Sequence, residues 1–232
     1  MKLAVIPARG GSKRIPRKNV KEFAGKPMIA WSISAAHASG LFDHIVVSTD
    51  DQEVAEIARA LGAEVPFMRP GALADDHTPT VPVIAHAITW VSQNWGSPNT
   101  TCCIYATAPF IRVDDLKLGA KLLLETGADY AFPVTSFPFP IQRAVHLTEN
   151  GRMQMFSPEH ALTRSQDLIE GFHDVGQFYW GRTEAWLSGR TIIGLGATPV
   201  IIPRHRAQDI DTPEDWTRAE MMFRLLGEME HQ

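Results

Sequence analysis

The chain has 232 residues, of which 44% are hydrophobic and 21% are charged, and its formal net charge is −4. This composition is typical of a soluble globular protein and excludes a disordered or fibrous chain. The small excess of negative charge also excludes a global basic field that would hold nucleic acid or a membrane surface.

Short apolar segments alternate with amphipathic segments from the first residue onward. The short segments are rich in β-branched and aromatic residues, which favours buried strands, and the longer segments follow helical periodicity. This alternation predicts one α/β domain over residues 1–232, with a mostly parallel twisted sheet flanked by helices on both faces. The expected strands are 3–6, 45–49, 101–105, 130–134 and 200–202, and the expected helices are 27–39, 51–61, 80–94, 114–126 and 212–229.

Two of the expected helices have start signals. Asp50 is followed three residues later by Glu53, the spacing of a capping box, so we expect Asp50 at the N-cap. Thr212 precedes Pro213 and two acidic residues, which indicates a threonine cap with proline at the first helical position.

The alternation breaks between residues 136 and 172, where proline and aromatic residues are frequent and periodicity is weak. We predict that about 136–172 form an inserted arm, either over the site or across a subunit boundary. Because an arm that exposes Phe137 and Phe139 needs a partner to bury them, we expect a homodimer. After the arm, the run 178–180 (Phe-Tyr-Trp) indicates a further buried strand.

The chain is expected to be cytoplasmic. No apolar run approaches the roughly 18 residues of a membrane span, and the apolar run before Arg9 is too short for a signal peptide. Cys102 and Cys103 are adjacent in an apolar stretch, which predicts two buried thiols rather than a disulfide or a zinc site.

The most informative segment follows the first expected strand. It contains two adjacent glycines, which allow a sharp turn and a close approach of the backbone to an anion. No Asp or Glu interrupts its basic residues, so the loop is suited to a triphosphate, although a solvated basic surface loop remains an alternative. The basic residues are Arg9, Lys13, Arg14, Arg17, Lys18 and Lys21.

Two common nucleotide-binding motifs are absent from the sequence. There is no G-x-x-x-x-G-K-[ST], and neither Gly10-Gly11 nor Gly194-Leu195-Gly196 completes a G-x-G-x-x-G. A P-loop enzyme and a dinucleotide-dependent oxidoreductase therefore lose their main support.

In this order, the motifs resemble those of the CMP-sugar synthetases, the family of the CMP-sialic acid synthetases. The resemblance covers most of the chain. It implies a nucleotide-diphospho-sugar transferase-like, Rossmann-like fold with a small dimerisation arm, and cytidylyl transfer from CTP to an acidic nine-carbon sugar. The motifs are Ile6-Pro7-Ala8-Arg9-Gly10-Gly11-Ser12-Lys13, Pro16-Arg17-Lys18-Asn19, Gly25-Lys26-Pro27-Met28, Val46-Val47-Ser48-Thr49-Asp50-Asp51, Arg69-Pro70 and Asp209-Ile210-Asp211-Thr212-Pro213-Glu214-Asp215.

Within the family, segments 105–110, 164–168 and 176–181 resemble the branch that acts on pseudaminic acid. Sialic acid members typically have Gln-Pro-Thr-Ser-Pro where this chain has Tyr-Ala-Thr-Ala-Pro at 105–109. The resemblance therefore implies that CTP and pseudaminic acid give CMP-pseudaminic acid and pyrophosphate, for glycan or flagellin glycosylation. Synthetases for N-acetylneuraminic, legionaminic or 3-deoxy-octulosonic acid remain alternatives, as does a nucleotide-binding regulator without turnover.

The resemblance also implies which residues bind the substrates. Those expected to contact CTP are Arg9, Gly11, Ser12, Lys13, Lys18, Asn19 and Arg69, and those expected to contact the sugar are Thr80, Tyr105, Arg143, Arg164 and Gln177. Arg9, Lys18 and Asp211 are expected to be catalytic, because phosphoryl chemistry depends on positioning and charge stabilisation. The planar guanidinium of Arg164 suits a carboxylate, and the Gln177 amide can both donate and accept.

Asp209 and Asp211 match the metal-binding carboxylates of the family. They are two apart on an extended segment, so their side chains share one face. Oxygen ligands of this kind suit Mg²⁺ or Mn²⁺, which would bridge CTP oxygens and lower the pKa of the attacking hydroxyl. Alternatively, Asp211 or Thr212 only caps the following helix; the cap does not need Asp209, so the two roles are compatible.

Overall fold

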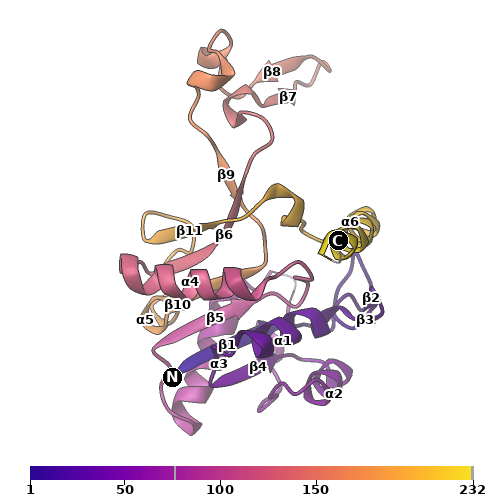
Figure 1. The fold of residues 1–232 in the computed structure, drawn as a ribbon, viewed down its shortest axis with the longest axis vertical. Coiled ribbons are helices and arrows are strands. Elements are labelled where there is room, and N and C mark those ends of the chain that lie inside the picture. The colour runs from indigo at the N-terminus through magenta and orange to yellow at the C-terminus, as the bar shows by residue number, and fades with distance from the viewer. Residues whose placement is uncertain (76, 231–232) are drawn as a thin grey trace.

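The computed structural model describes residues 1–75 and 77–230, and a twisted sheet forms its centre (Figure 1). Within these residues the main sheet has the strand order β11-β6-β10-β5-β1-β4, and β9 pairs with β6. β10 is antiparallel to both of its neighbours and β9 to β6, while the other pairs are parallel. The expected mostly parallel sheet is confirmed. Its strands are β1 (Lys2–Pro7), β4 (His44–Ser48), β5 (Thr100–Ile104), β6 (Tyr130–Ser136), β9 (Phe172–Asp174), β10 (Phe178–Arg182) and β11 (Ala197–Ile201).

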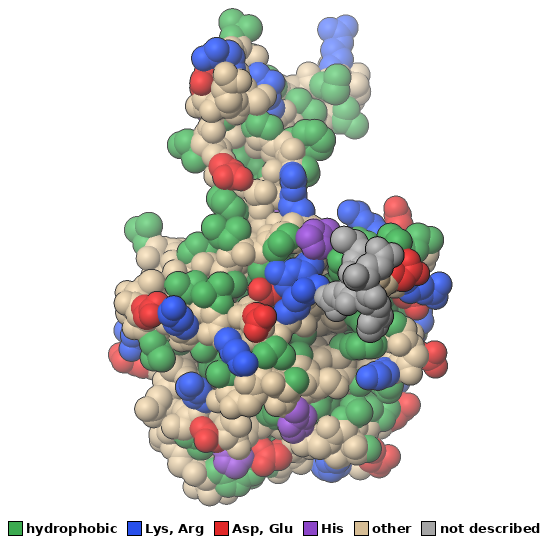
Figure 2. Space-filling view, viewed as in Figure 1, with side chains coloured by type: hydrophobic (Ala, Val, Ile, Leu, Met, Phe, Trp, Pro, Cys, Tyr) green, Lys and Arg blue, Asp and Glu red, His purple; other side chains and the backbone are tan. Residues whose placement is uncertain are grey.

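The chain between β6 and β9 projects from the body as a narrow extension (Figure 1). Pairing of Ser136 with Phe172 closes its stem, and a small hairpin lies near its tip. Figure 2 shows apolar side chains exposed along this extension, and Phe139 and Leu162 are 78% and 97% exposed. The elements within it are η2 (Ile141–Arg143), β7 (Val145–Leu147), β8 (Met153–Met155), η3 (Pro158–His160) and η4 (Ser165–Asp167).

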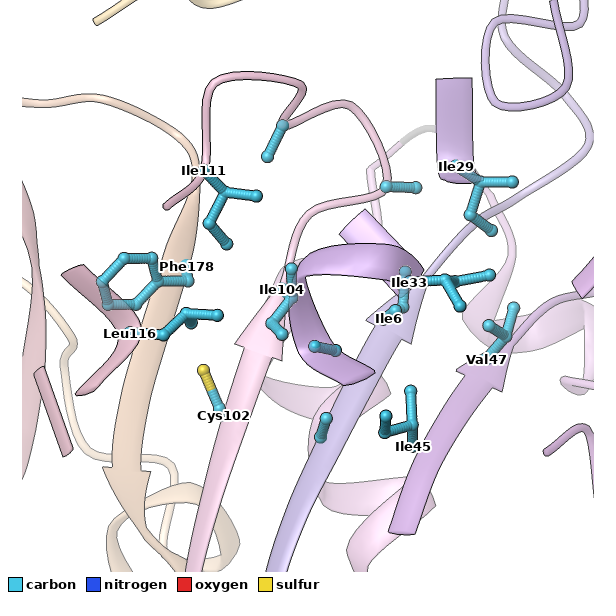
Figure 3. Packing of buried hydrophobic residues seen from close by; sticks show 14 of the residues in the cluster. Ile6, Ile29, Ile33, Ile45, Val47, Cys102, Ile104, Ile111, Leu116 and Phe178 are labelled. Carbon is cyan, nitrogen blue, oxygen red and sulfur yellow. The ribbon is translucent and has the colours of Figure 1, made fainter. Parts of the chain in front are cut away.

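Helices cover both faces of the sheet, as the alternation predicted. Successive residues of a strand point to opposite faces. Accordingly, Ile6 belongs to the core beneath α1, α2 and α4, and Val5 to the core beneath α3 and α5. Figure 3 shows the first of these layers, in which Ile6, Ile33 and Ile104 lie together. The helices are α1 (Met28–Ser39), α2 (Gln52–Ala60), α3 (Thr80–Asn94), α4 (Val113–Thr126), α5 (Thr183–Leu187) and α6 (Pro213–Glu230).

A third, smaller core joins the two ends of the chain. Phe23 of the short β2–β3 hairpin packs edge-on against Trp216 of α6, with ring centroids 5.4 Å apart. Ile210, two residues before the α6 cap, is fully buried in the same cluster. This packing places the segment before α6 beside the loop that follows β1. The hairpin strands are β2 (Glu22–Phe23) and β3 (Lys26–Pro27), and the remaining turns are η1 (Gly71–Leu73) and η5 (Arg204–Arg206).

One of the two helix-start predictions is wrong by one residue. Asp51, not Asp50, is the N-cap of α2, and its carboxylate accepts a hydrogen bond from the Val54 N–H at 3.0 Å. Asp50 instead accepts from the Gly10 N–H at 3.0 Å, which removes it from the helix. At α6, the Thr212 hydroxyl accepts from the Asp215 N–H at 3.2 Å, and the expected threonine cap is confirmed.

The remaining secondary-structure predictions agree closely with the structure. The aromatic run at 178–180 lies in β10 and is buried, and Cys102 and Cys103 are buried free thiols. The short helix α5 was not predicted, because five residues carry too little periodicity. None of the helices in the described part of the chain combines the length and apolar character needed to cross a bilayer.

Candidate active site

A cavity of about 510 Å³ opens beyond the carboxyl ends of β1 and β5, the edge where ligands bind in open α/β sheets. Five cationic side chains and one carboxylate line it, so it is suited to a polyanion. Most of the residues expected to bind CTP meet there, together with two of those expected to bind the sugar. The expected residues that line the cavity are Arg9, Ser12, Lys13, Lys18, Asn19, Arg69, Thr80, Tyr105 and Asp211.

The loop after β1 is held against the β4–α2 connection by hydrogen bonds that leave no room for a side chain at Gly10. A Cβ at Gly10 would lie 2.5 Å from a carboxylate oxygen of Asp51. The Gly10 N–H donates to Asp50, and the side-chain amide of Asn19 donates to the Arg9 carbonyl at 2.8 Å. The Gly10 amide is thus used by a carboxylate of the protein itself.

Arg17 fixes the far side of the same loop. Its backbone is left-handed, with φ of 57°, and its guanidinium pairs with the carboxylates of Asp51 and Glu53. The hydrogen bond from Arg17 lowers the pKa of Asp51, and the N-cap hydrogen bond from Val54 adds to this effect. Arg17 therefore connects the loop to the start of α2, and it is not among the residues that line the cavity.

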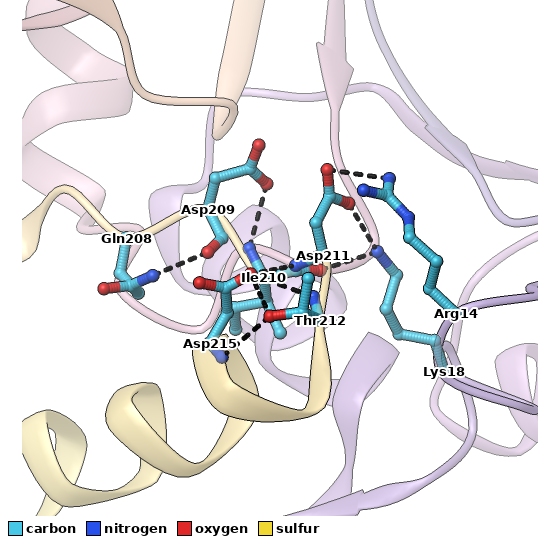
Figure 4. A network of polar contacts seen from close by, with 8 residues as sticks. All are labelled: Arg14, Lys18, Gln208, Asp209, Ile210, Asp211, Thr212 and Asp215. Atoms are coloured by element: carbon cyan, nitrogen blue, oxygen red, sulfur yellow. Dashed lines mark hydrogen bonds and ion pairs between the residues drawn. The ribbon is translucent and has the colours of Figure 1, made fainter. Parts of the chain in front are cut away.

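Lys18 and Arg14 contact the segment before α6 at one edge of the cavity (Figure 4). The Lys18 ammonium donates to the Ile210 carbonyl at 2.7 Å and lies 3.3 Å from one carboxylate oxygen of Asp211. The Arg14 guanidinium lies 2.8 Å from the other oxygen. Arg14 was counted in the basic loop but not assigned to the site, because sequence alone does not tell which basic residues of a loop face inward.

Asp209 and Asp211 project to the same side of their segment, as the two-residue spacing predicted (Figure 4). The pKa of Asp209 is raised, first because surrounding protein desolvates its carboxyl and second because of the negative charge of Asp211. A divalent cation would relieve this repulsion. Among the described residues no group of three or more His, Cys, Asp or Glu side chains could hold a metal. A pair of carboxylates fits Mg²⁺, which takes its other ligands from water and substrate phosphates.

Arg69 and Tyr105 form the inner wall of the cavity. Arg69 is buried and donates to the carbonyls of Ser48 at 2.6 Å and Leu73 at 3.3 Å, and burial lowers its pKa. The Tyr105 hydroxyl and the Thr80 hydroxyl are 3.0 Å apart, and burial raises the pKa of Tyr105 to about 12. Both side chains are therefore held in one orientation, and Tyr105 stays protonated at neutral pH.

Three residues expected to bind the sugar do not line this cavity. Gln177 is buried and its amide donates to the Arg206 carbonyl at 2.7 Å. Arg164 and Arg143 lie on the arm. The Arg164 side chain is 72% exposed and donates to Asp167 at 2.9 Å, and Arg143 donates to the Thr163 carbonyl. Within one chain these two arginines are not brought to the cavity.

Comparison with known proteins identifies the fold and the reaction class. A family model described as "Cytidylyltransferase" matches residues 3–169, which is most of the chain. The chain belongs to the cytidylyltransferase family. As a cytidylyltransferase it is a nucleotidyl-transferring enzyme, and the cation-lined cavity at the strand ends has the charge that such an enzyme needs for a nucleoside triphosphate.

Several relatives of this cytidylyltransferase are similar over nearly its full length. It is 41% identical to a pseudaminic acid cytidylyltransferase of Campylobacter jejuni, over 97% of both chains. It is 28% identical to a CMP-N,N'-diacetyllegionaminic acid synthase of Legionella pneumophila, again over 97% of both. The solved structure of a CMP-2-keto-3-deoxy-manno-octonic acid synthetase complexed with CTP has a TM-score of 0.70 and 18% identity, covering 97% of this chain and 98% of that one. The last likeness concerns the fold alone.

Proposed function

We propose that this cytidylyltransferase converts CTP and pseudaminic acid into CMP-pseudaminic acid and pyrophosphate. The observation that carries the proposal is the 41% identity to a pseudaminic acid cytidylyltransferase over 97% of both chains. In the reaction the anomeric hydroxyl oxygen of the sugar forms a bond to the α-phosphorus of CTP. The bond from that phosphorus to the β-phosphate oxygen breaks, pyrophosphate leaves, and the hydroxyl proton passes to solvent.

The side chains of the cavity suit this chemistry. Negative charge builds on the departing pyrophosphate, and Arg9, Lys13 and Lys18 lie where they would offset it. Asn19 holds the Arg9 carbonyl and so fixes the loop that carries these cations. When bound between Asp209 and Asp211, Mg²⁺ or Mn²⁺ would supply further positive charge beside the triphosphate. The chain's own task is then to orient CTP and to keep its α-phosphorus open to the sugar.

A homodimer is the second part of the proposal. The arm exposes large apolar side chains, among them Phe139 and Leu162, and such a patch is costly to leave in water. Arg143 and Arg164 lie on the same arm, away from the cavity of their own chain. We infer that the arm packs on a second copy and brings Arg164 to that copy's sugar carboxylate. The expected cytoplasmic location stays a prediction.

The sugar is tested by pyrophosphate release with CTP, Mg²⁺ and a panel of acids: pseudaminic, legionaminic, N-acetylneuraminic and 3-deoxy-octulosonic. The proposal predicts the highest kcat/KM with pseudaminic acid. A preference for legionaminic acid would instead favour a CMP-legionaminic acid synthase, the activity for which the Legionella relative is named. Release with none of the four acids, despite tight CTP binding, would favour a nucleotide-binding regulator.

A further inference from the structure

The segment that carries Asp209 and Asp211 is anchored by a buried ion pair that the sequence patterns did not single out. The Arg206 guanidinium forms two hydrogen bonds to the Asp115 carboxylate in the first turn of α4. The two side chains are only 10% and 12% exposed. Arg206 precedes Asp209 by three residues, so the pair fixes the chain close to the two carboxylates.

A second contact holds the backbone of Arg206 itself. The buried side-chain amide of Gln177 donates to the Arg206 carbonyl at 2.7 Å, and the backbone carbonyl of Gln177 accepts from the Tyr105 N–H at 2.9 Å. The end of β5, the start of β10 and the segment before α6 are therefore linked. On its other side the segment is fixed by buried Ile210 and by the Thr212 cap.

We propose that Arg206 and Asp115 are positioning residues that set the spacing of Asp209 and Asp211 for a divalent cation. Residues that orient metal ligands contribute strongly to metal affinity, although they do not touch the metal. This inference rests on the proposed function, since it assumes that Asp209 and Asp211 hold the metal that accompanies CTP.

The chemistry of the pair favours positioning over stabilisation alone. Burying two charges carries a large desolvation cost, and apolar residues of similar size often stabilise a protein equally well. What an Arg–Asp pair adds is direction, because the planar guanidinium meets a carboxylate in a fixed fork. The pair is also neutral as a unit, so replacing both members changes geometry without changing the net charge around the metal site.

The test uses the double variant Asp115→Leu with Arg206→Met, and it measures binding rather than turnover. Calorimetry without sugar measures the Kd of CTP in EDTA and the Kd of CTP with Mn²⁺. The ratio of these two Kd values is the gain in CTP affinity from metal, called below the gain from metal. We expect the double variant to bind metal-free CTP within twofold of the wild type. Its gain from metal should fall by about tenfold.

A matched control removes an Arg–Asp pair elsewhere. Arg190 and Asp129 pair at 2.5 Å near the opposite ends of the strands, so Asp129→Leu with Arg190→Met should leave the gain from metal unchanged. Arg206→Lys keeps the positive charge but lacks the planar guanidinium that pairs with Asp115, so part of the gain in CTP affinity from metal should be lost. That variant also serves if the double variant fails to fold.

The outcomes separate this inference from the proposed function. A lower melting temperature with an unchanged gain from metal, in either variant of the pair, would show a structural role only and overturn the inference. If the wild type gains nothing from metal, or Asp209→Asn leaves its gain intact, the proposed metal site fails first and the positioning role fails with it.

Discussion

The Lys18 ammonium lies 3.3 Å from a carboxylate oxygen of Asp211, although 193 positions separate the two residues in the chain. Lys18 belongs to the loop after β1, and Asp211 to the segment before α6. The same ammonium donates to the Ile210 carbonyl at 2.7 Å. The first and last functional segments therefore meet at one cavity, and substitutions in either should affect the same step.

Asp211→Asn should reduce turnover by about 100-fold or more, the scale on which a single transition-state charge contact acts. The change removes a negative charge and one oxygen of the proposed metal site, while the Thr212–Asp215 cap of α6 stays intact. Pyrophosphate release in saturating Mg²⁺ measures it, with circular dichroism to check the fold. Glu214→Gln, a neighbouring exposed acid, serves as the control and should stay within twofold. Near-normal turnover of Asp211→Asn would refute the metal assignment.

Arg164→Ala should raise the KM for the sugar by about tenfold or more and leave the KM for CTP within twofold. A charge-assisted contact to the sugar carboxylate is stronger than a neutral hydrogen bond, so its loss is expected to fall on that substrate. Arg152→Ala, at the exposed turn of the arm's hairpin, is the matched control. Equal losses for both substrates would count against a carboxylate contact.

Asp51→Asn should reduce the free energy of unfolding by about 1 kcal/mol at pH 7, as for a partly exposed ion pair. Asparagine can still accept the Val54 hydrogen bond, so the loss reports the Arg17 pair. The Arg17 hydrogen bond lowers the pKa of Asp51 in the folded state, so this stability is present above the unfolded pKa of about 4. It is lost as pH falls below that value and through the folded pKa.

Urea unfolding at several pH values measures this difference between wild type and Asp51→Asn, which should shrink below about pH 4. Glu125→Gln removes one partner of the exposed Lys121–Glu125 pair at 3.8 Å and should cost less. A difference that grows as the pH falls would contradict the assigned sign.

Light scattering at micromolar concentration should give twice the 25.7 kDa mass of one chain. Phe139→Ser with Leu162→Ser should shift the mass toward that of a monomer, because it removes exposed apolar surface from the arm. Leu195→Ser, a fully exposed leucine of the body, is the control and should leave the mass unchanged. A wild-type mass of 25.7 kDa would contradict the proposed homodimer.

The strand and helix pattern could be predicted because it depends on local periodicity. Leu3 to Ile6 alternate between the two faces of the sheet, and each face has its own core, so short apolar runs marked the strands correctly. The cap of α2 could not be placed between Asp50 and Asp51, because both are acids that can cap. The hydrogen bond from the Gly10 N–H engages Asp50 and leaves Asp51 as the cap, and Gly10 is 40 positions from Asp50 in the sequence.

Site residues could be predicted where they belong to a sequence motif, but not where only the folded chain brings them together. The basic loop and Asp211 line one cavity. Both could be assigned to the site from the sequence, because each lies in a short, charged motif. The Arg206–Asp115 pair joins positions 91 apart and belongs to no motif. Likewise, no local signal shows that Gln177 is buried against the Arg206 backbone, or that the arm holds Arg164 away from the cavity of its own chain.

A crystal structure with bound CTP and Mg²⁺ tests the central claim most directly. We expect the triphosphate against Arg9, Lys13 and Lys18, with the metal between its oxygens and the carboxylates of Asp209 and Asp211. A nucleotide bound elsewhere, or phosphates far from both carboxylates, would contradict it.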